Sequence, residues 1–245
     1  NWRDLIIGDT STLILDKYHP YEDLPKILNP PSGYLFNTNN SPFNATSEEY
    51  NLFEGDYNSS FSFREKENNR SLRFMEMIED YDKVSYDDFK VIKYDQKYPD
   101  SIAFIGNISE IFSINFENGD ITDIHNLITK WDRRGNYDNL GAAQWSLFYD
   151  HILRILDKNE IEVTDTIPEK YFIEGLRETK KYLVKNFGRV DILLGDLQKH
   201  VRGDIELPVS GLIDMIAPTY VVSRKDGTYR SVSVSYTHLT LPTIE

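Results

Sequence analysis

Three asparagines that stand close together, Asn37, Asn39 and Asn40, are the residues of this chain best suited to chemistry. A side-chain amide carries two N–H donors and no charge. At the end of a strand over a cleft, such a donor can hydrogen-bond the oxyanion that develops when a carbonyl is attacked. The alternative is that the three amides satisfy only the backbone of their own loop, and composition alone favours that alternative.

The asparagines lie within the stretch NPPSGYLFNTNNSPFNAT, residues 29–46. Pro30 and Pro31 restrict the backbone there, whereas Gly33 can adopt a positive φ. The apolar run Tyr34–Phe36 predicts a short strand that ends at the asparagines. We therefore expect a strand followed by a polar loop, which is where an oxyanion donor would have to lie.

The other side chains with catalytic potential show no spacing that indicates a site. Neither a His-x-x-x-His pair nor a Gly-rich phosphate loop occurs in the sequence. The acidic clusters at 79–82 and 86–88 are typical of solvated helix ends, although paired carboxylates also serve acid/base catalysis. The RGD sequence Arg202–Asp204 is interpreted as incidental. His19, His125, His151 and His200 are each interpreted as structural or surface residues, whereas His238 falls in the C-terminal segment 234–245, which is expected not to be native.

Composition excludes several classes of protein. The formal net charge of −13 argues against a nucleic-acid partner, because phosphate binding needs a basic surface. The sequence contains no cysteine, which excludes disulfides, thiol catalysis and cysteine-ligated metals. It also lacks a run of 18 apolar residues, so we expect no membrane partner.

Periodicity predicts an α+β chain whose middle part is mainly helical. Residues 1–46 predict short strands and ordered loops, and residues 47–68 an irregular surface excursion. Ser85, with Asp88 three positions later, predicts a capped helix start. The expected helices cover residues 69–81, 85–95, 107–131 with a turn at 118–120, 141–157 and 168–187, and a hairpin that turns at Lys225–Gly227 is expected within 215–233.

The asparagine stretch resembles a β-chain segment of the penicillin acylase family of N-terminal-nucleophile hydrolases, of the form NP.SGYI.N.NNSP. Later segments resemble the family in the same order, so the resemblance covers nearly all of residues 1–233. These segments are ENNRSLRFMEMIED, ITKWDRRGNYDNLGAAQW and GDLQKHVRGDIELPVSG, the last nearest the branch of acyl-homoserine-lactone and aculeacin acylases. The matching residues of the first segment are Asn29, Pro30, Ser32, Gly33, Tyr34, Asn37, Asn39, Asn40, Ser41 and Pro42.

The resemblance implies part of the family's four-layer αββα fold with helical excursions, truncated at both ends. It implies a periplasmic or secreted amidase that removes the acyl group from penicillin, acyl-homoserine-lactone or lipopeptide substrates, and hence a role in antibiotic metabolism. The family's nucleophile is a serine that begins the β-chain and uses its own α-amino group as the base. We expect that serine, the α-chain and the first part of the β-chain to lie outside this chain, which is then inactive alone.

The resemblance also implies roles for particular residues. Asn39 corresponds to the oxyanion donor, Arg70 to the arginine that orients it, and Thr38 to a substrate-contacting position that is aromatic in some members. No cofactor is expected. Calcium is common in the family, and one of its carboxylate ligands would fall near Tyr50 or Asn51. Because neither residue is a carboxylate, no metal ligand is expected in this chain.

Four segments follow from these observations. Residues 1–70 form a strand and loop segment with the oxyanion asparagine and its arginine, residues 71–187 a helical part, and residues 188–233 a strand and hairpin segment. Back-translation of Val234–Thr243 matches a sequencing-library adaptor, so residues 234–245 are expected not to be native. The start NWRDLIIGDT shows neither an initiator Met nor a signal pattern and is interpreted as an internal position of a longer polypeptide.

A second class of function stays open at this point. A non-catalytic module could keep the same scaffold and bind acyl chains or a protein partner. The acylase hypothesis requires the side chains of Asn39 and Arg70 to lie close together, whereas packing alone needs neither of them.

Overall fold

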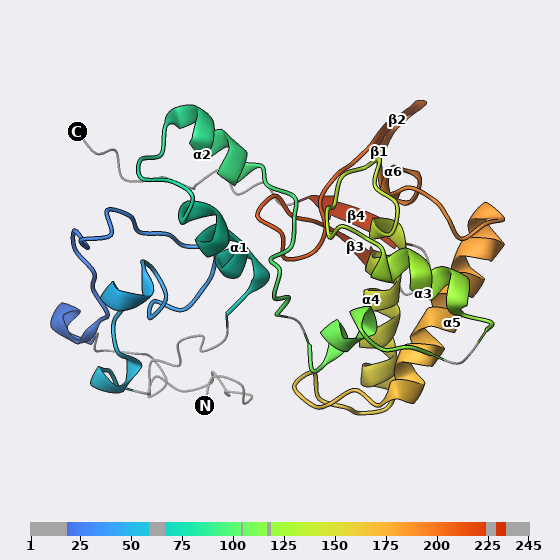
Figure 1. Cartoon of the computed structure of the whole chain (residues 1–245), viewed down its shortest axis with the longest axis horizontal. Helices are drawn as coiled ribbons and strands as arrows, with labels where there is room; N and C mark the ends of the chain where they lie inside the picture. Colours follow the sequence, from blue (N-terminus) through green and yellow to red (C-terminus); the bar gives the residue numbers. More distant parts are fainter. Residues whose placement is uncertain (1–18, 59–66, 104, 117–118, 224–228, 234–245) are drawn as a thin grey trace, which may run out of the picture. The chain divides into compact units, whose positions relative to one another are not determined.

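A computed structural model of the chain contains helices and short antiparallel hairpins, so the structure is of mixed α and β type, as predicted (Figure 1). The residues that it describes are 19–58, 67–103, 105–116, 119–223 and 229–233. The C-terminal segment assigned to an adaptor, residues 234–245, lies outside them. The chain divides into two compact units, of which one comprises residues 1–36 and 41–65 and the other residues 37–40 and 66–245.

The described part of the first unit contains only short 3-10 turns. The strand predicted at Tyr34–Phe36 is wrong, because the structure assigns no strand there. Phe36 N donates to Ala45 O at 2.9 Å, but a strand needs a continued ladder of such bonds. The predicted strands before residue 19 lie outside the described residues. The 3-10 turns are η2 (Tyr21–Asp23), η3 (Glu48–Tyr50) and η4 (Glu54–Asp56).

The second unit begins with two capped helices, α1 (Asn69–Ile78) and α2 (Tyr86–Lys93). Asn68 caps α1 by accepting a hydrogen bond from Ser71 N at 2.9 Å. The predicted capping of α2 is confirmed, since Ser85 Oγ accepts from Asp88 N and the Asp88 carboxylate accepts from Ser85 N. Such reciprocal bonds satisfy the N–H groups that a helix start leaves without partners.

Helices α4 (Ala142–Lys158) and α5 (Glu169–Phe187) pack side by side and contact α3 (Thr122–Thr129), and together they enclose the main core (Figure 1). Both long helices were predicted from their apolar periodicity. The predicted helical spacing after residue 107 produces only a 3-10 helix, η6 (Ile108–Phe112), before α3 begins. The largest fully buried side chains are Trp145, Tyr98, Phe148, Phe172, Ile108, Ile111, Ile121, Ile124, Ile128, Leu147, Ile152 and Leu156.

Two hairpins follow the short helix α6 (Leu194–Leu197). In the first, β1 (Lys199–Arg202) pairs with β2 (Ile205–Pro208), and in the second, β3 (Thr219–Ser223) pairs with β4 (Tyr229–Ser233), both antiparallel. The second hairpin confirms the prediction for residues 215–233, although its predicted turn residues lie outside the described part. No helix in the described ranges is both long and apolar enough to cross a membrane.

Two glycines with positive φ lie at helix ends. Gly188, with φ 72°, ends α5 in the left-handed conformation, which glycine adopts without strain. Gly141, with φ 98°, precedes α4, and its N–H donates to Gln144 Oε1 at 2.9 Å. A Cβ at position 141 would lie 2.6 Å from Trp131 Cβ and 2.7 Å from Leu127 O in α3, so the start of α4 lies too close to α3 and the residues after it for any other side chain.

We expect Gly141→Ala to lower the free energy of unfolding by about 3 kcal/mol and Gly188→Ala by about 1 kcal/mol. Both substitutions force alanine to a positive φ, but only the first adds a clash, because nothing lies within 4 Å of a Cβ at position 188. Urea unfolding followed by circular dichroism measures the difference. Equal losses in the two variants would contradict the steric explanation.

Candidate functional site

Two of the three candidate asparagines satisfy their own loop. Asn37 Oδ1 accepts from Asn39 N at 2.8 Å, and Asn40 Oδ1 accepts from Thr38 N at 2.6 Å. Bonds of this kind replace regular secondary structure and fix a short polar turn. The loop-satisfying alternative therefore holds for Asn37 and Asn40.

The side-chain oxygen of Asn39 bonds outside the loop instead. Arg70 Nη1 donates to Asn39 Oδ1 at 2.7 Å, between residues 31 positions apart in the sequence. Because a guanidinium carries only donors, the atom that faces it must be the amide oxygen, and the amide nitrogen occupies the other arm. Asn39 is exposed and has φ 64°, a left-handed conformation that asparagine adopts more readily than most residues.

Asn68, the cap of α1, connects the asparagine loop to the helix that carries Arg70. Its Nδ2 donates to Thr38 O at 3.1 Å, while its Oδ1 accepts from Ser71 N at the helix start. Arg70 is the second residue of α1, so the same cap that begins the helix also sets the distance between Arg70 and the loop. This contact is what the predicted orienting role of Arg70 requires, although the roles themselves stay predictions.

The guanidinium of Arg70 has a second partner that the sequence analysis missed. Arg70 Nε donates to Asp214 Oδ1 at 2.8 Å, with side chains that are 12% and 19% exposed. A signal for Asp214 does exist, since it is the only charged residue in the run GLIDMIAP, between the buried Leu212 and Met215. A carboxylate among apolar neighbours must find a partner, but the sequence does not identify that partner.

Thr38, the predicted substrate contact, is buried, with 9% of its surface exposed. Its hydroxyl donates to Asn40 Oδ1 at 3.0 Å and lies 3.4 Å from Asn68 Oδ1. In this structure the side chain holds the loop together, and a contact between Thr38 and substrate stays a prediction.

Asn51, near the position to which the resemblance assigns a calcium ligand of the family, does not offer its side-chain oxygen to a calcium ion. Asn51 Oδ1 accepts from Ala45 N at 2.9 Å and from Thr46 N at 3.1 Å, so its oxygen is used within the chain. Calcium takes six to eight oxygen ligands, usually with several carboxylates. In the part of the chain that the structure describes, no group of three or more His, Asp or Glu side chains is placed to hold a metal ion.

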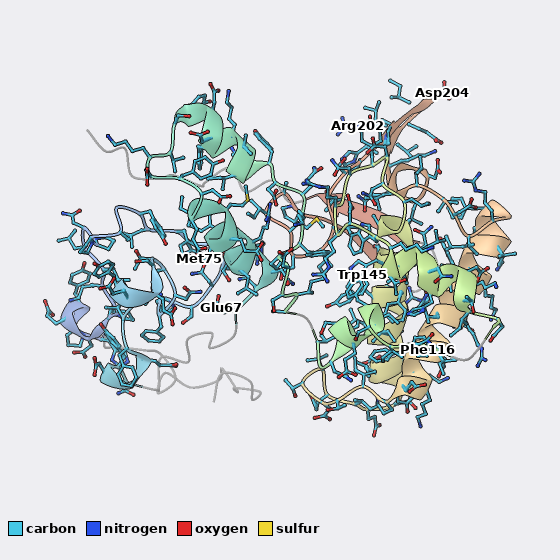
Figure 2. The ribbon with its side chains drawn as sticks, in the orientation of Figure 1. Glu67, Met75, Phe116, Trp145, Arg202 and Asp204 are labelled. Carbon is cyan, nitrogen blue, oxygen red and sulfur yellow. The ribbon has the colours of Figure 1, made fainter. Side chains whose placement is uncertain are left out.

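The remaining sequence candidates have structural surroundings. His125 is buried, with its Nε2 3.0 Å from Ile111 O and its ring in an edge-to-face contact with Phe116. His151 on α4 places Nδ1 3.0 Å from Thr179 Oγ1 on α5. Of the RGD residues, Arg202 ends β1, and Gly203 and Asp204 form the exposed turn that leads to β2 (Figure 2).

The arrangement of Asn39, Arg70 and Asp214 suits the binding of a negative oxygen. An amide N–H donor is held by a cation, and the cation is held by a half-buried carboxylate. A donor fixed in advance stabilises a developing oxyanion without reorganising during the reaction. None of the three residues is a nucleophile, so this chemistry requires an attacking group from elsewhere.

A comparison with protein families finds a match over most of the chain. The family model described as penicillin amidase matches residues 3–210. The matched region includes Asn39 and Arg70 and ends before Asp214.

We expect the free energy of unfolding to fall by about 2 kcal/mol between pH 6.5 and pH 4 through His151 alone. Burial and, secondarily, the positive charge of Arg154 lower the pKa of His151 from 6.5 to about 4. In this window the unfolded chain binds a proton that the folded chain does not, so acid destabilises the fold. His151→Gln removes this contribution, and chemical unfolding at several pH values measures the change in slope. Identical slopes would contradict the assignment.

Proposed function

The chain belongs to the penicillin amidase family, and on that premise we propose that the complete protein is an acylase that hydrolyses N-acyl amides. Within it, this chain supplies the side-chain part of the oxyanion hole. The observation that carries the proposal is the 2.7 Å hydrogen bond from Arg70 to Asn39 Oδ1. It joins the two residues to which the family resemblance assigns the oxyanion donor and its orienting arginine.

In the proposed reaction, the hydroxyl of an N-terminal serine outside this chain attacks the amide carbonyl of the substrate. The carbonyl oxygen becomes negative, and Asn39 Nδ2 donates a hydrogen bond to it. The amine then leaves with a proton, and water releases the acyl group from the serine. Arg70 contributes by holding Asn39 Oδ1, which both orients the amide and draws electron density from its nitrogen. One such donor is typically worth a factor of about 10²–10³ in kcat.

Neutrality is the reason that an asparagine suits this position. A lysine or arginine in direct contact with the carbonyl would also bind the carboxylate of the product strongly. The amide of Asn39 carries no full charge, so it can donate to the carbonyl oxygen of the substrate without binding the product carboxylate strongly. The positive charge of Arg70 contacts Asn39 and not the carbonyl itself. The stabilisation is then greatest where charge develops, which is the condition for a faster chemical step.

Further properties belong to the proposal through family membership. We place the chain in a four-layer αββα fold in which it forms part of the β-chain and needs an upstream α-chain for activity. The substrates are penicillin-like, acyl-homoserine-lactone or lipopeptide amides, with the branch of acyl-homoserine-lactone and aculeacin acylases as the nearest. The proposed location is periplasmic or secreted.

Asn39→Gly in the complete protein is expected to lower kcat for N-acyl amide hydrolysis about 10²-fold or more, with KM changed much less. Glycine is the right replacement because Asn39 has φ 64°, which alanine would adopt only with strain. Initial rates over a series of acyl chain lengths measure the effect and identify the preferred substrate.

Asn44→Ala is the matched control, since Asn44 lies in the same stretch and its Oδ1 accepts from Asn51 Nδ2 at 3.3 Å. It should leave kcat within about threefold of the wild type. A wild-type protein without amidase activity, or an Asn39→Gly variant with full kcat, would favour the non-catalytic binding module instead.

A further inference from the structure

Asp214 collects hydrogen bonds from the first two residues of α1. Its Oδ1 accepts from Arg70 Nε at 2.8 Å, and its Oδ2 accepts from Asn69 N at 2.8 Å and from Asn69 Nδ2 at 3.0 Å. The backbone N–H of Asn69 is one of the donors that a helix start leaves unsatisfied. Asp214, 145 positions from Asn69, therefore accepts hydrogen bonds both from the start of α1 and from the guanidinium of Arg70.

Asn69 is fixed independently of Asp214, and this makes the site selective for a carboxylate. Asn69 is fully buried, with Oδ1 accepting from Ala103 N at 2.7 Å and Nδ2 donating to Ala103 O at 2.9 Å. The side-chain amide of Asn69 therefore cannot flip, and its Nδ2, together with the backbone N–H of Asn69, donates to Asp214 Oδ2. With Arg70 donating to the other oxygen, both oxygens of residue 214 must be acceptors, and only a carboxylate offers two.

The backbone around Asp214 is held by contacts of its own. Asp214 has φ 57°, between the buried Leu212 and Met215. The hydroxyl of Tyr98 donates to Ile213 O at 2.5 Å, and Ala217 N donates to Asp95 O at 3.2 Å. The carboxylate is therefore presented by a fixed loop and does not depend on Arg70 for its place.

We propose that Asp214 is a positioning residue of the amide-hydrolysing site. Its carboxylate fixes the guanidinium of Arg70 in the orientation that holds Asn39 Oδ1 and directs the amide N–H at the oxyanion. The inference rests on the proposed function and adds to it a residue beyond the matched region of the family model.

Orientation and charge predict opposite effects of neutralising Asp214. If charge alone mattered, removal of the carboxylate would leave the positive charge of Arg70 uncompensated and strengthen oxyanion binding. If orientation matters, the guanidinium loses the acceptor that holds its Nε and samples other rotamers, so the Asn39 amide is no longer held in one place. The proposal therefore requires activity to fall although the site becomes more positive.

Asp214→Asn in the complete protein tests this directly, because it keeps the shape of the side chain and replaces one acceptor with a donor. We expect kcat to fall about 10- to 100-fold, with KM changed less than about threefold. In the Asn39→Gly background the same substitution should lower kcat no further, since residues that act through one another are not additive. Full kcat in Asp214→Asn, or an additive loss in the double variant, would overturn the inference.

Asp95→Asn is the matched control for a purely structural role. Arg73, one turn further along α1, pairs with Asp95, whose side chain is 9% exposed, with Nε and Oδ2 3.0 Å apart. Asp95→Asn should lower the melting temperature and leave kcat within about threefold of the wild type. Equal losses of kcat in Asp95→Asn and Asp214→Asn would assign Asp214 to helix anchoring only and overturn the inference.

Two further measurements keep the test decisive. If Asp214→Asn does not fold, Arg70→Lys replaces it, because one ammonium group lacks the planar fork that reaches both Asn39 and Asp214. The loss of kcat caused by Arg70→Lys should again be absent in the Asn39→Gly background.

If the wild type hydrolyses no N-acyl amide, the proposed function fails by itself. A crystal structure of Asp214→Asn then tests the geometric part of the inference alone: an unchanged bond from Arg70 Nη1 to Asn39 Oδ1 would overturn it, and loss of that bond would show that Asp214 positions Arg70 whatever the site binds.

Discussion

The guanidinium group of Arg70 bonds to Asn39 and to Asp214 at the same time, and the arrangement of the site depends on this one group. Nη1 donates to Asn39 Oδ1 and Nε to Asp214 Oδ1. The donors of a guanidinium lie in one plane at fixed angles, so holding one of them limits where the others point. A lysine in the same place would supply the charge without this geometric constraint.

The cost of such an arrangement is the removal of charges from water. The side chains of Arg70 and Asp214 are 12% and 19% exposed, so each depends on the other for compensation. A partly buried ion pair of this kind adds little net stability, but loss of one partner leaves the other charge uncompensated. Its value lies in the fixed orientation, which fits the role proposed for the pair.

The core of the second unit matters to the site because it places the loop that carries Asp214. Gly211 N donates to Gly135 O at 2.6 Å, and Gln198 Nε2 donates to Gly211 O at 2.9 Å. A Cβ at position 135 would lie 2.8 Å from Met215 Sδ and 3.3 Å from the backbone C of Gly211, so the two segments pack closely only because residue 135 is glycine. Packing far along the chain from Asn39 thus decides where the carboxylate meets α1.

Sequence alone determined the long helices, the cap at Ser85, the second hairpin and, through the family resemblance, the pairing of Asn39 with Arg70. Helix periodicity and caps are local properties, written within a few residues. Tertiary structure decided that Tyr34–Phe36 forms no strand, that Asn37 and Asn40 serve their own loop, and that Asp214 completes the site. Those outcomes depend on which distant segment lies opposite, and a contact between residues 144 positions apart leaves no periodic pattern in the sequence.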